Sequence, residues 1–182
     1  MPIIKHRGKE PRIDPDAFVM SNATLIGEVV IGSNVLVLSN AVLRADFNLI
    51  SVGESVCIQE NAVLNPVLEE AIIIEGHSLI GYGAKLHGGQ IGRGAFVGMN
   101  SVILQGVRVG ENSIIAAGSI LTENMKVPSK SLVMGTPAKV VREVSDEDIK
   151  WMEIGVGEYM KILKDYQKGM KEWEIRYGTS LR

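Results

Sequence analysis

The chain has 182 residues, of which 46% are hydrophobic and 22% are charged, as expected of one soluble globular domain with a sizeable core. Its formal net charge of −2 gives no field that would attract nucleic acid or an anionic membrane. The first residues do not resemble a signal peptide, and no apolar run reaches the roughly 18 residues of a membrane helix, so we expect a cytoplasmic protein that binds neither nucleic acid nor membrane.

From residue 13 onward, an aliphatic residue recurs at every sixth position with three breaks in phase. The members of this series are Ile13, Val19, Leu25, Ile31, Val37 and Leu43; Val52, Ile58 and Leu64; Ile74, Ile80 and Leu86; and Ile91, Val97, Ile103, Val109, Ile115, Leu121, Val127 and Val133. A period of six fits neither a helix nor a simple alternating strand, but it fits a short strand followed by a turn. Three such units close a triangular coil of about 18 residues, and coils stack by parallel strand pairing about 4.8 Å apart. The sequence therefore predicts an all-β fold, a single-stranded parallel β-helix over residues 13–144, after an N-terminal segment of residues 1–12.

Small residues often follow the aliphatic position, as at Gly32, Gly53, Gly81 and Gly92. We interpret them as corner residues, where glycine tolerates positive φ. The single cysteine, Cys57, excludes an internal disulfide and fits a reducing compartment. Its place in an apolar unit favours a small buried filler over the alternative of a reactive thiol.

Two breaks in phase add residues to the coil. Leu43 and Val52 lie nine positions apart, and Leu64 and Ile74 lie ten apart, so both intervals must bulge outward. Long loops on a rigid scaffold tend to carry function, and we favour the loop NPVLEE at 65–70 because polar residues stack beside it.

Stacking of the coils predicts a vertical column on one corner that consists of Arg44, Asn65 and His87. Polar residues that lie nearby in this register are Asp46, Gln59, Glu60 and Tyr82. Convergent polar side chains beside inserted loops are typical of a functional site. From spacing alone, a hydrated outer face with an ion pair from Arg44 at a subunit interface is an equally good interpretation.

The last segment, 145–182, is predicted to be a helix. Ser145 can cap it, and Asp146, Glu147 and Asp148 place negative charge on its first turn. Apolar residues then recur with helical spacing at Ile149, Met152, Val156, Tyr159, Met160, Leu163, Tyr166, Met170 and Trp173. We expect this stripe to dock on the β-helix or on a neighbouring subunit, with Gly155 and Gly157 as points where the helix could be interrupted.

Five segments resemble a known family: LRADFN at 43–48, IQENAVLN at 58–65, IGYGAKLHGG at 80–89, VGMNSVIL at 97–104 and VMGTPAKVVREVSDEDI at 133–149. They are similar to the γ-class carbonic anhydrases and their bacterial and archaeal relatives, including proteins encoded beside phenylacetate and carnitine pathways. The resemblance extends from about Ile13 through the terminal helix. It implies left-handed winding and a homotrimer with a zinc ion at each interface, held by two histidines of one subunit and one of its neighbour.

In this family the zinc ligands correspond to Asn65, Tyr82 and His87, of which His87 alone is a histidine. The resemblance also implies catalytic roles for Arg44, Asp46 and Gln59, which match the family, and for Glu60, which replaces a frequent aspartate. Asn100, in the VGMN segment, is a further candidate for a polar group at the same cleft, or else an ordinary turn residue.

The two substitutions decide which activity the sequence predicts. Catalytic zinc takes three protein ligands and a water, as in carbonic anhydrases. An asparagine carbonyl is a weak neutral ligand, and a tyrosine must lose a proton of pKa about 10 to bind metal well. The other histidines, His6 and His77, lie elsewhere on the predicted coil. We therefore expect weak or absent zinc binding and CO2 hydration, in a trimer whose cleft still takes bicarbonate or another small anion or carbonyl compound near Arg44.

Two alternatives remain open at this stage. The ending GTPAKVVR at 135–142 is shared with hexapeptide acetyltransferases, which bind acyl-CoA between subunits and use a histidine as general base, a role that His87 could fill. Relatives that lack zinc ligands also serve as non-catalytic scaffold subunits.

Overall fold

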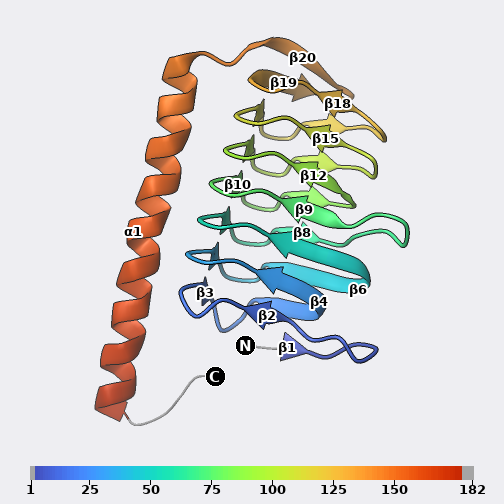
Figure 1. Ribbon diagram of the computed structural model, residues 1–182. Helices are drawn as coiled ribbons and strands as arrows, with labels where there is room; N and C mark the ends of the chain where they lie inside the picture. Colours follow the sequence, from blue (N-terminus) through green and yellow to red (C-terminus); the bar gives the residue numbers. More distant parts are fainter. Residues whose placement is uncertain (1–2, 178–182) are drawn as a thin grey trace.

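The structure is a computed structural model that describes residues 3–177, with side chains described through residue 172. The predicted N-terminal residues 1–2, the predicted helical residues 178–182 and the side chain of Trp173 lie outside the described residues. Short parallel strands wind in about seven turns around one interior, and a single helix follows them (Figure 1). The predicted left-handed parallel β-helix with a C-terminal helix is confirmed.

The strands form three faces of a triangular prism. Face A contains β1 (Ile3–Ile4), the first halves of β4 (Thr24–Ile31) and β6 (Val42–Val52), β8 (Val63–Leu64), β11 (Lys85–Leu86), β14 (Val102–Ile103) and β17 (Ile120–Leu121). Face B contains β2 (Arg12–Ile13), the second halves of β4 and β6, β9 (Ile72–Ile74), β12 (Gly89–Ile91), β15 (Arg108–Val109) and β18 (Lys126–Val127). Face C contains β3 (Phe18–Val19), β5 (Leu36–Val37), β7 (Cys57–Ile58), β10 (Leu79–Ile80), β13 (Phe96–Val97), β16 (Ile114–Ile115) and β19 (Ser131–Gly135). Faces A and B belong to one continuous sheet because β4 and β6 run around the corner between them.

The aliphatic series fills the inside of the prism. From Leu25 to Val133 its members are almost completely buried and form one continuous hydrophobic cluster with the small residues between them, such as Ala23 and Ala62. Each coil thus buries a triangle of aliphatic side chains on the triangle of the next coil, which is the main stabilising interaction of this fold.

The corner glycines are needed for a reason other than the one predicted. Positive φ does not occur at Gly81, directly after the aliphatic residue, but two positions later, at Gly83 (φ +66°). A Cβ atom added to Gly81 would lie 2.7 Å from the carbonyl oxygen of Val97 in the next coil. Glycine at this position therefore permits close approach of successive coils, whereas the positive φ falls on Gly83 and on its counterparts, many of them asparagines.

The first predicted bulge lies within strand β6. Gly27 of β4 pairs with Ala45, but Val29 pairs with Ile50, so Glu28 alone is opposed by residues 46–49. Gly27 has φ +76°, and an added Cβ would come within 2.3 Å of the Ala45 carbonyl oxygen. The extra residues thus extend the corner between faces A and B without ending the strand.

The second predicted bulge is a short hairpin between β8 and β9. Val67 and Glu70 pair in an antiparallel bridge, and Leu68 at the tip is 64% exposed. The hairpin projects from the same edge of the prism as the bend of β6 (Figure 1). One coil later, the spacing across this corner, from Leu86 to Ile91, is one residue shorter than the regular period of six, and the chain turns through Gly88 (φ +96°) and Gly89 (φ +94°).

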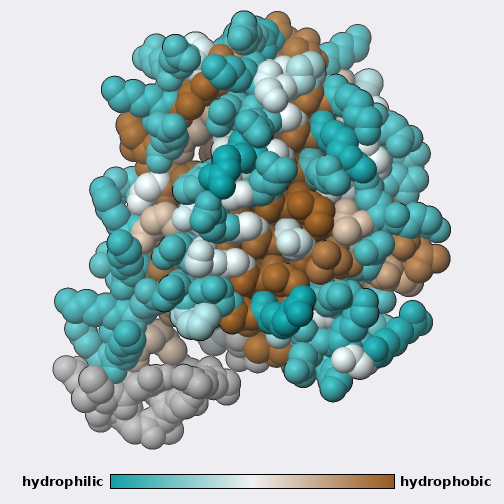
Figure 2. Space-filling view, viewed as in Figure 1, coloured by the Kyte–Doolittle hydropathy of each residue, from teal (hydrophilic) through white to brown (hydrophobic). Residues whose placement is uncertain are grey.

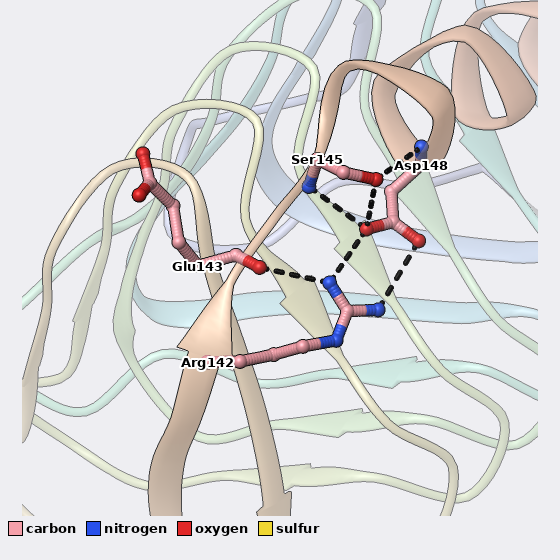
Figure 3. Close-up of polar contacts among 4 residues, drawn as sticks. All are labelled: Arg142, Glu143, Ser145 and Asp148. Atoms are coloured by element: carbon pink, nitrogen blue, oxygen red, sulfur yellow. Dashed lines mark hydrogen bonds and ion pairs between the residues drawn. The ribbon is translucent and has the colours of Figure 1, made fainter.

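The end of the prism is closed by an antiparallel hairpin of β19 and β20 (Ala138–Glu143). Helix α1 (Asp146–Tyr177) begins directly after it, with Ser145 as the N-cap. The Ser145 hydroxyl accepts the Asp148 N–H (3.2 Å), while the Asp148 carboxylate accepts the Ser145 N–H (2.8 Å) and two N–H groups of Arg142 (Figure 3). The ion pair with Arg142 and the bonds from Ser145 hold the pKa of Asp148 well below its usual range.

Helix α1 runs back along face C, from the closed end of the prism towards the first coil (Figure 1). Val156 and Leu163 pack on Leu36, Leu38 and Leu79 of face C. Aromatic contacts mark the two ends of this contact, Phe96 with Trp151 (5.4 Å between centroids) and Phe18 with Tyr166 (5.5 Å).

The helix is continuous through Gly155 and Gly157, so the interruption considered from the sequence does not occur. In the described part of the chain, no helix combines the length and apolar character required to span a bilayer.

The molecular surface has apolar side chains in the middle of the side shown in Figure 2, and hydrophilic side chains surround them.

Candidate functional site

Arg44, Asn65 and His87 form the predicted column. Strand register places Leu43 beside Leu64 and Leu64 beside Leu86, so the residue after each of them stacks at the corner between faces A and B. Arg44 Nη2 donates to Asn65 Oδ1 (2.9 Å), and His87 Nδ1 lies 3.1 Å from the Asn65 carbonyl oxygen. The predicted stacking is therefore confirmed: Arg44 bonds to the side chain of Asn65, and His87 bonds to its backbone.

The amide of Asn65 is fully engaged within this column. Its Oδ1 accepts from Arg44, and its Nδ2 donates to the Arg44 carbonyl oxygen (3.0 Å), with a longer contact to Asp46 Oδ1 (3.5 Å). Asp46 in turn pairs with Arg44 Nη1 at 2.7 Å. Asn65 thus acts as a bridge that fixes the Arg44–Asp46 ion pair, and its side-chain oxygen Oδ1 is directed at the Arg44 guanidinium.

The hydrogen bond of His87 fixes its tautomer when the imidazole is neutral. The Asn65 carbonyl oxygen can only accept, so Nδ1 must carry the hydrogen. The lone pair of Nε2 then faces away from Asn65 on an exposed side chain. This nitrogen can accept a proton or a hydrogen bond from a ligand.

Gln59 and Tyr82 lie at the other corner of face A, between faces C and A. Gln59 is only 4% exposed; its Oε1 accepts the backbone N–H of Tyr82 (3.0 Å), and its Nε2 donates to the hydroxyl of Tyr159. The Tyr159 and Tyr82 hydroxyl oxygens are 2.9 Å apart. Helix α1 therefore contributes directly to the candidate site through Tyr159, and burial together with the bond to Tyr82 raises the pKa of that phenol.

Glu60 and Asn100 lie on the same corner as Tyr82. The backbone carbonyl of Glu60 accepts from Gly83, and that of Tyr82 accepts from Asn100. Glu60 Oε2 is buried and has no hydrogen-bond partner in the described part of the chain. Asn100 has φ +55°, and its Oδ1 packs against Gly83, which accounts for it as a turn residue.

Within one chain, the candidate residues thus form two groups. Arg44, Asp46, Asn65 and His87 lie at one edge of face A, and Gln59, Glu60, Tyr82, Asn100 and Tyr159 lie at the other. No three His, Cys, Asp or Glu side chains come together as a metal site would need anywhere in the described residues. The donor set at the family's zinc positions does not fit zinc, because the amide of Asn65 is bonded to Arg44 and the phenol of Tyr82 is bonded to Tyr159.

Comparison with known proteins agrees with the resemblance seen in the sequence. The carnitine operon protein CaiE of Escherichia coli K12 is 39% identical over 156 residues, which cover 86% of this chain and 80% of that protein. The chain belongs to the CaiE family. Residues 88–123 also match the family model "Bacterial transferase hexapeptide (six repeats)".

Two solved structures share the fold of this CaiE homologue over most of its length. A hexapeptide transferase family protein from Anaplasma phagocytophilum is 34% identical with a TM-score of 0.87, over 91% of this chain and 98% of that chain. The product of the BC4754 gene of Bacillus cereus is 32% identical with a TM-score of 0.90, over 91% of this chain and 96% of that chain.

Two residues of the CaiE homologue were missed by the sequence analysis. Tyr159 was assigned only to the apolar stripe of the helix. Glu70, in the inserted hairpin, accepts the N–H groups of Gly89 (3.1 Å) and Gly106 (2.6 Å) and pairs with Arg108. Burial opposes the charge of Glu70, but these bonds outweigh it and lower the pKa of the carboxyl. Glu70 therefore ties the hairpin beside His87 to the following coils.

A hollow of about 500 Å³ lies on the opposite side of the helix from Tyr82 and is not part of this site. Met152 and Val156 line it from the helix, and His77 and Arg93 line it from the corner between faces B and C. Both basic side chains already contact Glu54, Arg93 at 2.9 Å and His77 at 3.5 Å. None of the candidate site residues lines this hollow.

Proposed function

We propose that this CaiE homologue is a homotrimeric, γ-class carbonic anhydrase-like protein of the cytoplasm that binds a small anion or carbonyl compound, such as bicarbonate, between protomers. Its zinc binding is weak or absent, and so is its CO2 hydration. The ligand class follows from the Arg44 guanidinium and the Tyr82 phenol, which offer hydrogen-bond donors to oxygen atoms, and from the lone pair of His87 Nε2, which can accept a bond from the hydroxyl of bicarbonate.

The observation that carries the proposal is the engagement of Asn65. At a position where the family resemblance implies an imidazole, its side-chain oxygen accepts from the Arg44 guanidinium at 2.9 Å. The Arg44 guanidinium competes with any metal ion for the neutral side-chain oxygen of Asn65. Its positive charge also repels the metal ion. His87 alone would remain as an imidazole ligand, which is insufficient for a catalytic zinc ion.

The same contacts favour an anion. Arg44 is 44% exposed in its side chain, and Asp46 occupies one of its terminal nitrogens, while Nη2 contacts Asn65. A guanidinium has five N–H groups, so hydrogens remain available to a carboxylate-like ligand. The exposed imidazole of His87 lies beyond Asn65 in the column, and its Nε2 atom can accept the O–H of bicarbonate.

Assembly of protomers would complete the site. The two groups of candidate residues flank face A of one chain, so they can act on one ligand only where an edge of one protomer meets the other edge of its neighbour. Exposed apolar side chains on or beside face A support such a contact, with Val63 37%, Tyr82 40% and Met99 49% exposed. This arrangement agrees with the trimer implied by the family.

The test combines three measurements on the purified chain. Light scattering should give a trimer, elemental analysis should give far less than one zinc per protomer, and calorimetric titration should detect bicarbonate binding. Arg44→Gln should weaken that binding at least tenfold, because a charge-assisted hydrogen bond contributes about 1.5–3 kcal/mol. Arg12→Gln, an exposed arginine on face B, is the matched control.

Stoichiometric zinc with rapid CO2 hydration would overturn the proposed loss of the metal site. Failure of the wild-type protein to bind bicarbonate would overturn the ligand class. A protein that is silent to metal, bicarbonate and CoA and that copurifies with another chain would instead be a scaffold subunit.

Acyl transfer is a second candidate, favoured by the outward lone pair of His87, which suits a general base. A GDP-perosamine N-acetyltransferase from Caulobacter crescentus, solved with CoA and GDP-perosamine, is 25% identical with a TM-score of 0.54 over 73% of this chain and 57% of that chain. Acetyl-CoA should raise the melting temperature at modest concentration if the CaiE homologue shares this activity. An unchanged melting temperature in the presence of acetyl-CoA would reject this activity.

A further inference from the structure

The hydrogen atoms of the Gln59–Tyr159–Tyr82 network can be assigned from the partners alone. The backbone N–H of Tyr82 is a donor, so the side-chain atom of Gln59 that faces it must be the oxygen Oε1. The amide nitrogen Nε2 therefore faces Tyr159 and donates to its hydroxyl oxygen. Because Gln59 is almost completely buried, this orientation is held by packing as well as by hydrogen bonds.

Tyr159 is then the favoured donor to Tyr82. The Tyr159 oxygen already accepts from Gln59, and its own hydrogen has the Tyr82 oxygen, 2.9 Å away, as its acceptor in the described part of the chain. Either direction leaves one hydroxyl hydrogen without an acceptor in the described part of the chain, and the direction that leaves it on the more exposed side chain, Tyr82, is favoured because water can reach it there. The network thus has one direction, from Gln59 to Tyr159 to Tyr82.

The hydrogen of the Tyr82 hydroxyl is left over at the end of this chain. Among the described residues it has no acceptor of its own, and the buried Glu60 Oε2, which has no partner, does not take it. Tyr82 is 40% exposed and lies at the edge of face A. A donor that receives a hydrogen bond on its oxygen is also a stronger donor, because hydrogen bonds in a chain polarise one another.

We propose that the Tyr82 hydroxyl is an oriented hydrogen-bond donor for a carboxylate or carbonyl oxygen of the bound ligand, and that Tyr159 is the positioning residue that directs it. This inference rests on the proposed function and specifies it. Tyrosine at this position then puts a neutral hydrogen-bond donor where the family resemblance implies a zinc-binding histidine. The oxygen of the bound anion or carbonyl compound is held by the O–H group of Tyr82 from one protomer and the N–H groups of Arg44 from its neighbour.

The test is a double-mutant cycle on bicarbonate and acetate affinity in the full-length protein. Tyr82→Phe removes the donor and should weaken both anions roughly tenfold, as expected for one hydrogen bond to a charged group. Tyr159→Phe leaves Tyr82 in place but removes the contact that orients it, and should weaken binding about threefold. In the Tyr82→Phe background, Tyr159→Phe should have no further effect, because it acts through Tyr82.

A merely structural role of Tyr159 would give a different pattern. Tyr159→Phe would then weaken anion binding equally in the wild-type and Tyr82→Phe backgrounds, and it would lower the melting temperature in both. Tyr166→Phe is the matched control, since Tyr166 lies on the same helix and stacks on Phe18 outside the site. Its affinity for the anions should equal that of the wild-type protein.

Each outcome separates this inference from the proposed function. If Arg44→Gln weakens anion binding while Tyr82→Phe does not, the ligand site stands and the role of Tyr82 is overturned. If the wild-type chain binds neither bicarbonate nor acetate, both fail together. If the losses at Tyr82 and Tyr159 are fully additive, Tyr82 binds the ligand without direction from Tyr159, and the positioning role is rejected.

Discussion

The guanidinium of Arg44 and the side-chain amide of Asn65 form a reciprocal pair across two coils. Arg44 Nη2 donates to Asn65 Oδ1 at 2.9 Å, and Asn65 Nδ2 returns a bond to the Arg44 carbonyl oxygen at 3.0 Å. A neutral imidazole at position 65 would also offer one acceptor nitrogen and one N–H, but the two point away from each other across the ring, so they could not both be directed at Arg44. The asparagine is therefore built into the polar column, and the substitution changes the chemistry of the corner as well as removing a ligand.

Restoring both imidazoles should restore a zinc site. We expect the double variant Asn65→His/Tyr82→His to bind close to one zinc per protomer together with His87, because three histidines and a water satisfy tetrahedral zinc. Neither single variant should hold zinc stoichiometrically. Elemental analysis after dialysis against a weak chelator measures this directly.

The matched control is Tyr82→His/Asn124→His, which adds the same number of histidines but puts one at an exposed corner that already has φ +61°. His77 shows that a histidine is compatible with that backbone conformation, since it also has φ +61°. Equal zinc in both double variants would mean that the column at residues 65 and 87 is not the metal position.

Glu70 should stabilise the fold in a pH-dependent way. Its carboxylate accepts from Gly89 and Gly106 and pairs with Arg108, and these bonds hold its pKa below the ordinary value of 4.5. Since the folded pKa is the lower one, the stabilisation is present above about pH 4.5 and is lost as pH falls through the lowered pKa. Glu70→Gln should reduce the free energy of unfolding by about 1–3 kcal/mol at neutral pH and flatten its fall in acid.

Urea titrations between pH 3 and pH 7 measure this effect. Glu69→Gln is the control, because Glu69 is an exposed neighbour in the same hairpin. If both variants lose the same free energy, the bonds of Glu70 to the next coils contribute nothing measurable.

The residues that sequence analysis located correctly are those fixed by counting. Arg44, Asn65 and His87 form a column because the period of six sets the register between coils, and the residue after each aliphatic position must stack. The bulges between Leu43 and Val52 and between Leu64 and Ile74 follow from the same count. The prediction that Gly81 is needed for positive φ was wrong, because the close approach of the next coil requires glycine there.

Tyr159 and Glu70 could not be located in this way. The partners of Tyr159 depend on the rotation of helix α1 about its axis and on its height along face C, and neither is encoded in the hexad count. Glu70 and Glu69 are adjacent identical residues, and only the path of the hairpin decides which one reaches Gly106. Both contacts link segments whose relative position is set by tertiary packing.

The N-cap of helix α1 should contribute measurably to stability. Ser145→Ala removes the hydroxyl that accepts the Asp148 N–H, and we expect the free energy of unfolding to fall by about 1 kcal/mol. Ser145→Asp keeps an acceptor, but it places a second carboxylate beside Asp148, so it should recover only part of the loss. Thermal or urea unfolding followed by circular dichroism gives both values, with the exposed Ser129→Ala as control.

Cys57 should be inert in the native protein. It is completely buried between face C and helix α1, and burial, with the nearby charge of Glu60, raises the pKa of its thiol far above the usual range. The thiolate is the reactive form, so Ellman's reagent at pH 8 should label the native protein only at the rate of opening or unfolding, and at once in guanidinium chloride. The variant Cys57→Ala/Ser129→Cys moves the thiol to an exposed position and should react rapidly while folded. Rapid labelling of native wild-type protein would show that helix α1 does not stay docked on face C, and the contact of Tyr159 with Gln59 and Tyr82 would then be transient as well.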